Sequence, residues 1–182
     1  MASIDFPLHG ERASAKLSEL LISGLAGRGR VLAPDALALW GEFARQSVAD
    51  LSGALDALTT LDAIDSGRLA YAGFSMGAFL GALFCSSDPR PRAAALALGG
   101  AGLGPPDLDP AAHVGRFAPR PLLLVNATRD ERVSRAAAEA LHAAAGEPKQ
   151  IAWFECGHTD LPGAALKTMW AFLARELGVP SP

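Results

Sequence analysis

From residue 68 to the end of the chain, short uncharged apolar runs alternate with longer segments of helical periodicity. The apolar runs predict strands and lie at residues 69–72, 94–98, 122–125 and 151–154. The helical patterns lie at residues 76–86, 134–145 and 164–177, while residues 99–117 are rich in Gly and Pro and predict an irregular segment. Strands that alternate with helices form parallel sheets with right-handed crossovers. We therefore expect an α/β fold, a three-layer α/β/α sandwich with a mostly parallel sheet.

The residues before 68 give weaker patterns. Residues 42–61 carry apolar side chains at helical spacing, and residues 17–25 predict a second, shorter helix. Two short apolar stretches, residues 3–8 and 30–33, predict strands. No repeat or linker divides the chain, and 182 residues fit the usual size of one domain, so we expect a single domain over residues 1–182.

Composition excludes several classes of protein. The net charge of −3 argues against a nucleic-acid partner, which requires a basic face. The two cysteines, Cys85 and Cys156, are too few for a disulfide scaffold or a structural zinc site. Each is expected to be a small buried hydrophobe. We expect no metal and no cofactor.

The stretch from Leu69 to Ser87 carries no charge and approaches the length of a membrane span. Its glycines and serines, and its change from strand to helix periodicity, instead predict a buried strand followed by a buried helix. We expect no association with a membrane. Because the first twelve residues lack the basic start and apolar core of a signal peptide, we expect a cytoplasmic protein.

The sharpest local motif is Gly73-Phe74-Ser75-Met76-Gly77, a G-x-S-x-G pattern between a predicted strand and a predicted helix. A serine there sits on a tight turn, with its hydroxyl exposed and its neighbours' N–H groups at a helix N-terminus. We expect Gly73 and Gly77 to be required, because a Cβ at either position would collide with the adjacent strand or helix. A glycine-rich turn with an incidental serine is the alternative.

A serine nucleophile needs a base, and the base needs a carboxylate that orients it. Asp130 follows the strand predicted at 122–125, and His158 follows the strand predicted at 151–154. In a parallel sheet both residues emerge at the same edge as Ser75, where ligands of open α/β sheets bind. Other candidates for the acid are Glu131, Glu155 and Asp160, and other candidates for the base are His9, His113 and His142.

Together, the Ser75 motif, the strand and loop carrying Asp130, and Cys156-Gly157-His158 resemble the α/β-hydrolase family. Small esterases and dienelactone-hydrolase-like members are the most similar, over about residues 68–178. The resemblance implies that Ser75 is the nucleophile, Asp130 the acid and His158 the base. It also implies that the backbone N–H of Met76 contributes to the oxyanion hole.

The N-terminal part departs from the family pattern, which places a His-Gly oxyanion loop after the third strand. The chain has one such pair, His9-Gly10, and two alternatives follow. In the first, residues 3–8 are that third strand, the N–H of Glu11 is the second oxyanion donor, and residues 30–33 form the next strand of a six-stranded sheet.

In the second alternative, residues 4–12 resemble the segment that follows the fourth strand in dienelactone-hydrolase-like relatives. The first three strands and the oxyanion loop are then missing from this N-terminally shortened fold. A remodelled N-terminus or a second copy of the chain would close the gap in the sheet, so a homodimer is expected on this alternative.

The resemblance implies a serine hydrolase that cleaves short-chain carboxylic esters through an acyl-enzyme, with a small-molecule ester as its substrate. The segment 99–117 is too short to form a deep lid, which favours short acyl chains. A non-catalytic or degenerate hydrolase-fold binding protein is one alternative. Hydrolysis of a lactone or another bond by the same triad is the other.

Overall fold

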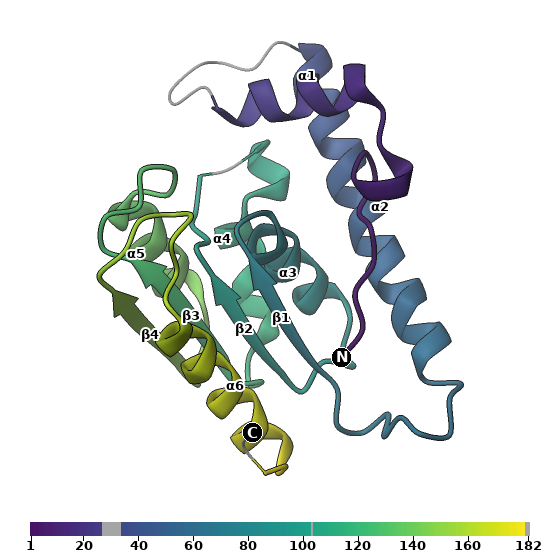
Figure 1. The fold of residues 1–182 in the computed structure, drawn as a ribbon, viewed down its shortest axis with the longest axis vertical. Helices are drawn as coiled ribbons and strands as arrows, with labels where there is room; N and C mark the ends of the chain where they lie inside the picture. The colour runs from purple at the N-terminus through teal and green to yellow at the C-terminus, as the bar shows by residue number, and fades with distance from the viewer. Residues whose placement is uncertain (27–33, 103, 181–182) are drawn as a thin grey trace.

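A computed structural model describes residues 1–26, 34–102 and 104–180. Its sheet has four parallel strands in the order β1-β2-β3-β4 (Figure 1). These strands are β1 (Ala70–Phe74), β2 (Ala93–Ala97), β3 (Leu122–Ala127) and β4 (Lys149–Phe154). The helices that follow β1, β3 and β4 are α3 (Met76–Ser87), α5 (Arg135–Ala144) and α6 (Gly163–Leu177). The predicted α/β fold with a parallel sheet is confirmed.

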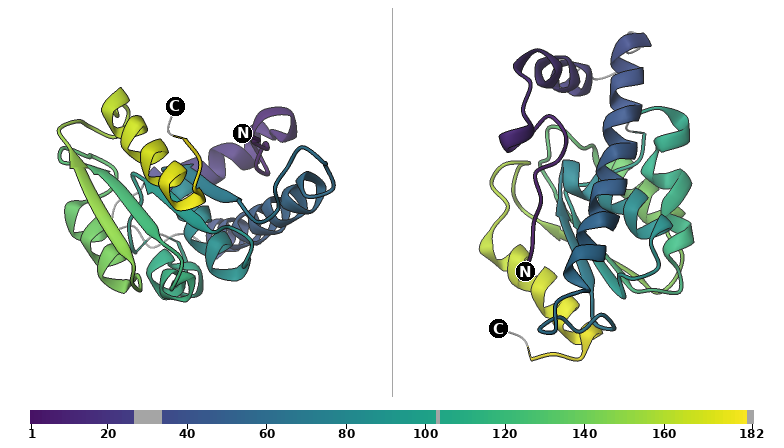
Figure 2. Two further views of the ribbon diagram at one scale, coloured as in Figure 1. Left: turned by 90° about the horizontal axis from the view of Figure 1, so that it is seen from below. Right: turned by 90° about the vertical axis from the view of Figure 1, so that its right-hand side faces the viewer.

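Helices cover both faces of this sheet, so it forms the middle of three layers (Figure 2). On β2, Ala93, Ala95 and Ala97 pack toward α6, whereas Ala94 and Leu96 pack toward α3 and α5. All five residues of β2 are buried. A strand covered on both faces has no polar alternation, which explains the uninterrupted apolar run.

The connection from β2 to β3 is more regular than its Gly and Pro content predicts. It contains three short helical turns, η2 (Pro106–Leu108), α4 (Pro110–His113) and η3 (Val114–Phe117). Val114 and Phe117 are buried in the same cluster as residues of α3. The segment therefore packs down onto the sheet's helical layer.

Before β1, the structure confirms both predicted helices, α1 (Ala15–Ala26) and α2 (Pro34–Leu58). The second helix begins eight residues earlier than the apolar spacing predicts, because Pro34 and Asp35 suit the first turn of a helix. Within the described residues, none of the helices is long and apolar enough to cross a bilayer.

The prediction of a strand at residues 3–8 is wrong. The segment forms no strand pairing; it turns at Leu8, whose φ is +64°, and enters the short helix η1 (Gly10–Arg12). Phe6 and Leu8 pack against the cluster that joins α2 to α3. The six-stranded alternative therefore loses its first strand, and its next strand, at 30–33, lies outside the described residues.

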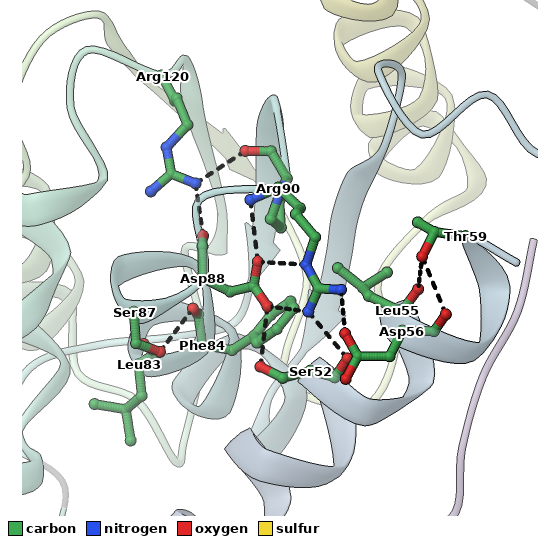
Figure 3. A network of polar contacts seen from close by, with 11 residues as sticks. Ser52, Leu55, Asp56, Thr59, Leu83, Phe84, Ser87, Asp88, Arg90 and Arg120 are labelled. Carbon is green, nitrogen blue, oxygen red and sulfur yellow. Dashed lines mark hydrogen bonds and ion pairs between the residues drawn. The ribbon is translucent and has the colours of Figure 1, made fainter.

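A polar network attaches α2 to the loop between α3 and β2 (Figure 3). The Asp88 carboxylate accepts a hydrogen bond from Ser52 at 3.0 Å and two from the Arg90 guanidinium, at 2.9 and 2.5 Å. Arg90 also bridges to Asp56 of α2 at 2.6 Å. The guanidinium beside Asp88 holds the pKa of that carboxyl below its usual value, so the network stays charged at neutral pH.

Arg120 secures the same loop from the other side. Its guanidinium donates to the backbone carbonyls of Cys85 at 2.6 Å, Asp88 at 2.8 Å and Pro91 at 3.0 Å. It also lies 4.2 Å from the centre of the Phe117 ring. One side chain thus satisfies carbonyls at the end of α3, where no helical partner is available.

We expect Arg120→Ala to lower the free energy of unfolding by about 3 kcal/mol, because several partly buried carbonyls lose a charged donor at once. Urea unfolding followed by circular dichroism measures this change. The control is Arg45→Ala, since Arg45 is exposed and its ion pair among the described residues is a 3.6 Å contact with Glu42. An equal loss of unfolding free energy in the two variants would contradict the stabilising role of Arg120.

Candidate active site

Three side chains meet where β1, β3 and β4 end. The Ser75 hydroxyl lies 2.7 Å from Nε2 of His158. On the other side of the imidazole, Nδ1 lies 2.8 Å and 3.0 Å from the two oxygens of the Asp130 carboxylate. Each residue follows a different strand of one parallel sheet, so all three emerge at the same edge, the place the sequence predicts.

Ser75 occupies a strained turn between β1 and α3. Its φ of +51° is rare for a residue with a side chain. Its N–H donates to the Ala97 carbonyl at 2.8 Å, and its own carbonyl accepts from Ala78 and Phe79 of α3. The hydroxyl makes no capping bond to the helix, so it is free to face His158.

The glycines of the motif have different roles. A Cβ at Gly73 would lie 2.3 Å from the Gly77 carbonyl oxygen, a distance that requires the backbone to move. A Cβ at Gly77 would meet only the Tyr71 hydroxyl, at an ordinary 3.7 Å. The expectation that both glycines are required is therefore correct for Gly73 and wrong for Gly77.

Backbone donors hold the Asp130 carboxylate in place. Oδ1 accepts from the N–H of Arg132 at 2.7 Å and from the N–H of Val133 at 2.8 Å. The side chains of His158 and Asp130 are only 4% and 3% exposed, while Ser75 is half-buried. Asp130 and His158 are thus shielded from water, which strengthens their electrostatic interaction, and the serine stays within reach of solvent.

Two further carboxylates fix the backbone of the loop that carries His158. Glu131 Oε2 accepts from the N–H of His158 at 3.1 Å, and Asp160 Oδ1 accepts from the N–H of Gly157 at 2.5 Å. A Cβ at Gly157 would lie 2.9 Å from that Asp160 oxygen. Hydrogen bonds from its own N–H and from His158 hold the pKa of Glu131 below its usual value, so Glu131 remains a charged acceptor.

The contacts of each carboxylate distinguish Asp130 from the other candidates for the acid. Asp130 reaches the imidazole ring, whereas Glu131 and Asp160 reach backbone N–H groups. Glu155 is exposed at the end of β4. The sequence alone suggests Glu131 and Asp160 only as alternatives to Asp130. Their role as acceptors for backbone N–H groups could not be predicted, because such an acceptor leaves no characteristic spacing in the sequence.

The remaining histidines belong to other elements, and the hydrogen bonds found for His9 and His113 go to other groups than Ser75. His9 Nδ1 is 2.9 Å from the Pro7 carbonyl, and His113 Nε2 is 2.7 Å from the Asp107 carbonyl. His142 lies in the last turn of α5. Within the described parts of the chain, no group of three or more His, Cys, Asp or Glu side chains could hold a metal ion.

Both cysteines are buried free thiols, as their apolar surroundings predict. Burial raises the pKa of the Cys85 thiol and that of the Cys156 thiol, so neither is an activated nucleophile.

The two predicted oxyanion donors differ in their surroundings. Met76 is the first residue of α3, and the first N–H groups of a helix have no partner within it. The N–H of Glu11 donates to the Asp5 carboxylate at 3.1 Å. The N–H of Glu11 is therefore already engaged, whereas the N–H of Met76 lies at the open start of a helix.

Comparison with known proteins supports the fold assignment. No protein-family model matches the chain, and no curated protein matches it by sequence. Solved structures do match: the α/β hydrolase GrgF from Penicillium sp. sh18 has 15% identity and a TM-score of 0.66, over 74% of this chain and 73% of that one. A cold-adapted esterase from an Arctic intertidal metagenomic library has 21% identity and a TM-score of 0.66, over 90% of this chain and 77% of that one.

TT1662 from Thermus thermophilus has 23% identity and a TM-score of 0.65, and the match covers 97% of this chain and 76% of that chain. The architecture shared with these structures is the α/β-hydrolase fold, as the sequence motifs predict.

We expect opposite effects from alanine at the two motif glycines. Gly73→Ala should lower the free energy of unfolding by about 2 kcal/mol or more, because its Cβ forces the backbone of Gly77 away. Gly77→Ala should be neutral or stabilise by up to about 1 kcal/mol, since the position is helical and has room. Urea unfolding of both variants measures the difference, and equal destabilisation would contradict this geometry.

Proposed function

We propose that this protein is a serine hydrolase that cleaves short-chain carboxylic esters. The observation that carries the proposal is the continuous hydrogen-bonded chain from Ser75 through His158 to Asp130. A serine hydroxyl becomes a useful nucleophile only beside such an oriented base. The esterase among the structures of similar fold is consistent with this chemistry.

In the proposed reaction, His158 Nε2 takes the hydroxyl proton as Ser75 Oγ attacks the ester carbonyl carbon. Asp130 stabilises the imidazolium that forms and keeps Nε2 directed at the serine. The imidazolium then gives its proton to the leaving alcohol as the carbon–oxygen bond breaks. A water molecule, deprotonated by His158, releases the acid from the acyl-enzyme by the same steps in reverse.

Negative charge develops on the carbonyl oxygen during both attacks. The Met76 N–H, at the start of α3, is the donor we assign to that oxygen, and the positive end of the helix dipole supports it. Loss of one such donor typically lowers turnover by about 10²–10³-fold, so the rate should depend strongly on this single contact.

A preference for short acyl chains follows from the segment between β2 and β3. Its turns pack against α3, with Val114 and Phe117 buried. A segment held down in this way leaves little chain to form a deep lid over the strand ends. Small activated esters are therefore the substrates we expect.

The direct test is hydrolysis of p-nitrophenyl acetate and p-nitrophenyl butyrate by the wild type and by Ser75→Ala. We expect the wild type to turn over both esters and the variant to lose at least about 10³-fold in kcat, since the nucleophile is gone. Equal slow release of nitrophenol by both proteins would favour a non-catalytic hydrolase-fold protein. Lactones tested in parallel distinguish ester from lactone hydrolysis.

A second prediction concerns Glu131 as a positioning residue. We expect Glu131→Ala to lower kcat about tenfold with KM unchanged, because the backbone of His158 loses its acceptor and the imidazole shifts. Glu131→Gln keeps an acceptor oxygen and should retain most of the activity. The matched control is Glu155→Ala, which removes an exposed carboxylate just before the same loop. Similar losses in the alanine and glutamine variants would contradict the positioning role.

A further inference from the structure

The sheet ends openly at β1. This strand pairs with β2 on one side, and within the described residues no strand pairs with its other side. The N-terminal segment runs between β1 and α2 (Figure 1), yet residues 1–4 make no hydrogen bond to any described residue. Residues 1–3 are exposed. The edge is therefore covered only loosely by the chain itself.

The backbone groups that face this opening can be identified. The Leu69 carbonyl and the Ser75 N–H both bond to the β2 side, to Arg92 and Ala97. Because successive residues of a strand direct their N–H and C=O groups to alternate sides, the odd-numbered residues bond to β2. The N–H and C=O groups of Ala70, Ala72 and Phe74 consequently point to the open edge.

A cavity of about 620 Å³ extends along this edge, bounded by the N-terminal segment, α2, β1 and α6. It does not include the catalytic residues. Phe74 of β1 and Trp170 of α6 line it and are 42% and 38% exposed. Arg68 is the one charged side chain among the described residues of the lining, and its guanidinium pairs with Asp65 at 2.6 Å. The strand itself has no proline or charge that would block another strand.

We propose that this edge binds the same edge of a second copy of the chain. The two sheets then join through antiparallel β1 strands, with a two-fold axis at Ala72. Ala72 of each copy faces the other and exchanges both of its outward hydrogen bonds. Ala70 faces Phe74 of the second copy with the same reciprocal bonding, so every outward group of β1 is satisfied. Residues 1–3 move aside as the copies meet.

The side chains of β1 suit this pairing. In the register centred on Ala72, the large Phe74 lies opposite the small Ala70, and the large Tyr71 lies opposite Gly73. No two bulky side chains face each other. A register shifted by two residues would place Phe74 opposite Ala72 and leave Ala70 unpaired, with fewer bonds satisfied.

Charge also favours a copy of this chain as the occupant. A two-fold interface brings each surface against itself, so any net charge on it repels its copy. The described residues that line the edge avoid that penalty, because their one charged side chain, Arg68, is already paired with a carboxylate, and the α-amino group of Met1 leaves the edge with residues 1–3. Exposed Phe74 and Trp170 then bury apolar area next to the strand pairing.

Light scattering during size-exclusion chromatography, over a range of protein concentrations, tests the proposal. The wild type should show the mass of two 18.8 kDa chains. Ala70→Lys should raise the dimer Kd by about 100-fold or more, because it places a charge at the joined edges. The matched control is Gln150→Lys, an exposed position on β4 at the opposite edge, which should remain dimeric.

A second variant tests the hydrogen bonds at the edge of β1 without introducing a charge. Ala70→Pro removes only an outward-facing N–H at the first residue of the strand, so it should weaken the dimer and leave the circular dichroism spectrum unchanged. A wild type with the mass of one chain at every concentration would overturn the proposal. The proposal would also be overturned if the dimer Kd were the same in Ala70→Lys, Ala70→Pro and Gln150→Lys, because another surface would then hold the dimer.

Discussion

The strained turn at Ser75 is the constraint on which the rest of the site depends. A positive φ at a residue with a side chain costs about 1–3 kcal/mol, and favourable contacts in the surrounding structure must offset this cost. Here the turn is bonded to β2 through Ala97 and to α3 through Ala78. The helix that follows is buried along both sides, against the sheet and against α2. This packing keeps the hydroxyl in a position that the isolated turn would not adopt.

The same parallel sheet brings Ser75 together with the proposed base, His158, and the proposed acid, Asp130. Strands β3 and β4 are in register to their ends, so their loops leave side by side. Backbone N–H groups fix the Asp130 carboxylate, and the side chain of Glu131 reaches back to the backbone of His158. The loop that carries Asp130 and Glu131 therefore holds His158 twice, once at the imidazole and once at the main chain.

The sequence was sufficient to predict the parts of this structure that depend on local pattern. Buried parallel strands are uniformly apolar, and the G-x-S-x-G turn has a fixed place between a strand and a helix, so Ser75, Asp130 and His158 could be placed at one sheet edge. The prediction of a strand at residues 3–8 is wrong, because Phe6 and Leu8 of this segment pack against helices instead. The role of Glu131 could not be predicted, since it depends on where a neighbouring loop directs its N–H.

The proposed mechanism requires that His158 activates Ser75. Labelling with a fluorophosphonate probe, followed by mass spectrometry of the digested protein, tests it most directly. We expect rapid phosphonylation confined to the peptide that carries Ser75, and a rate at least about 10³-fold lower in His158→Ala. No adduct on that peptide, or equal rates in the two proteins, would contradict it.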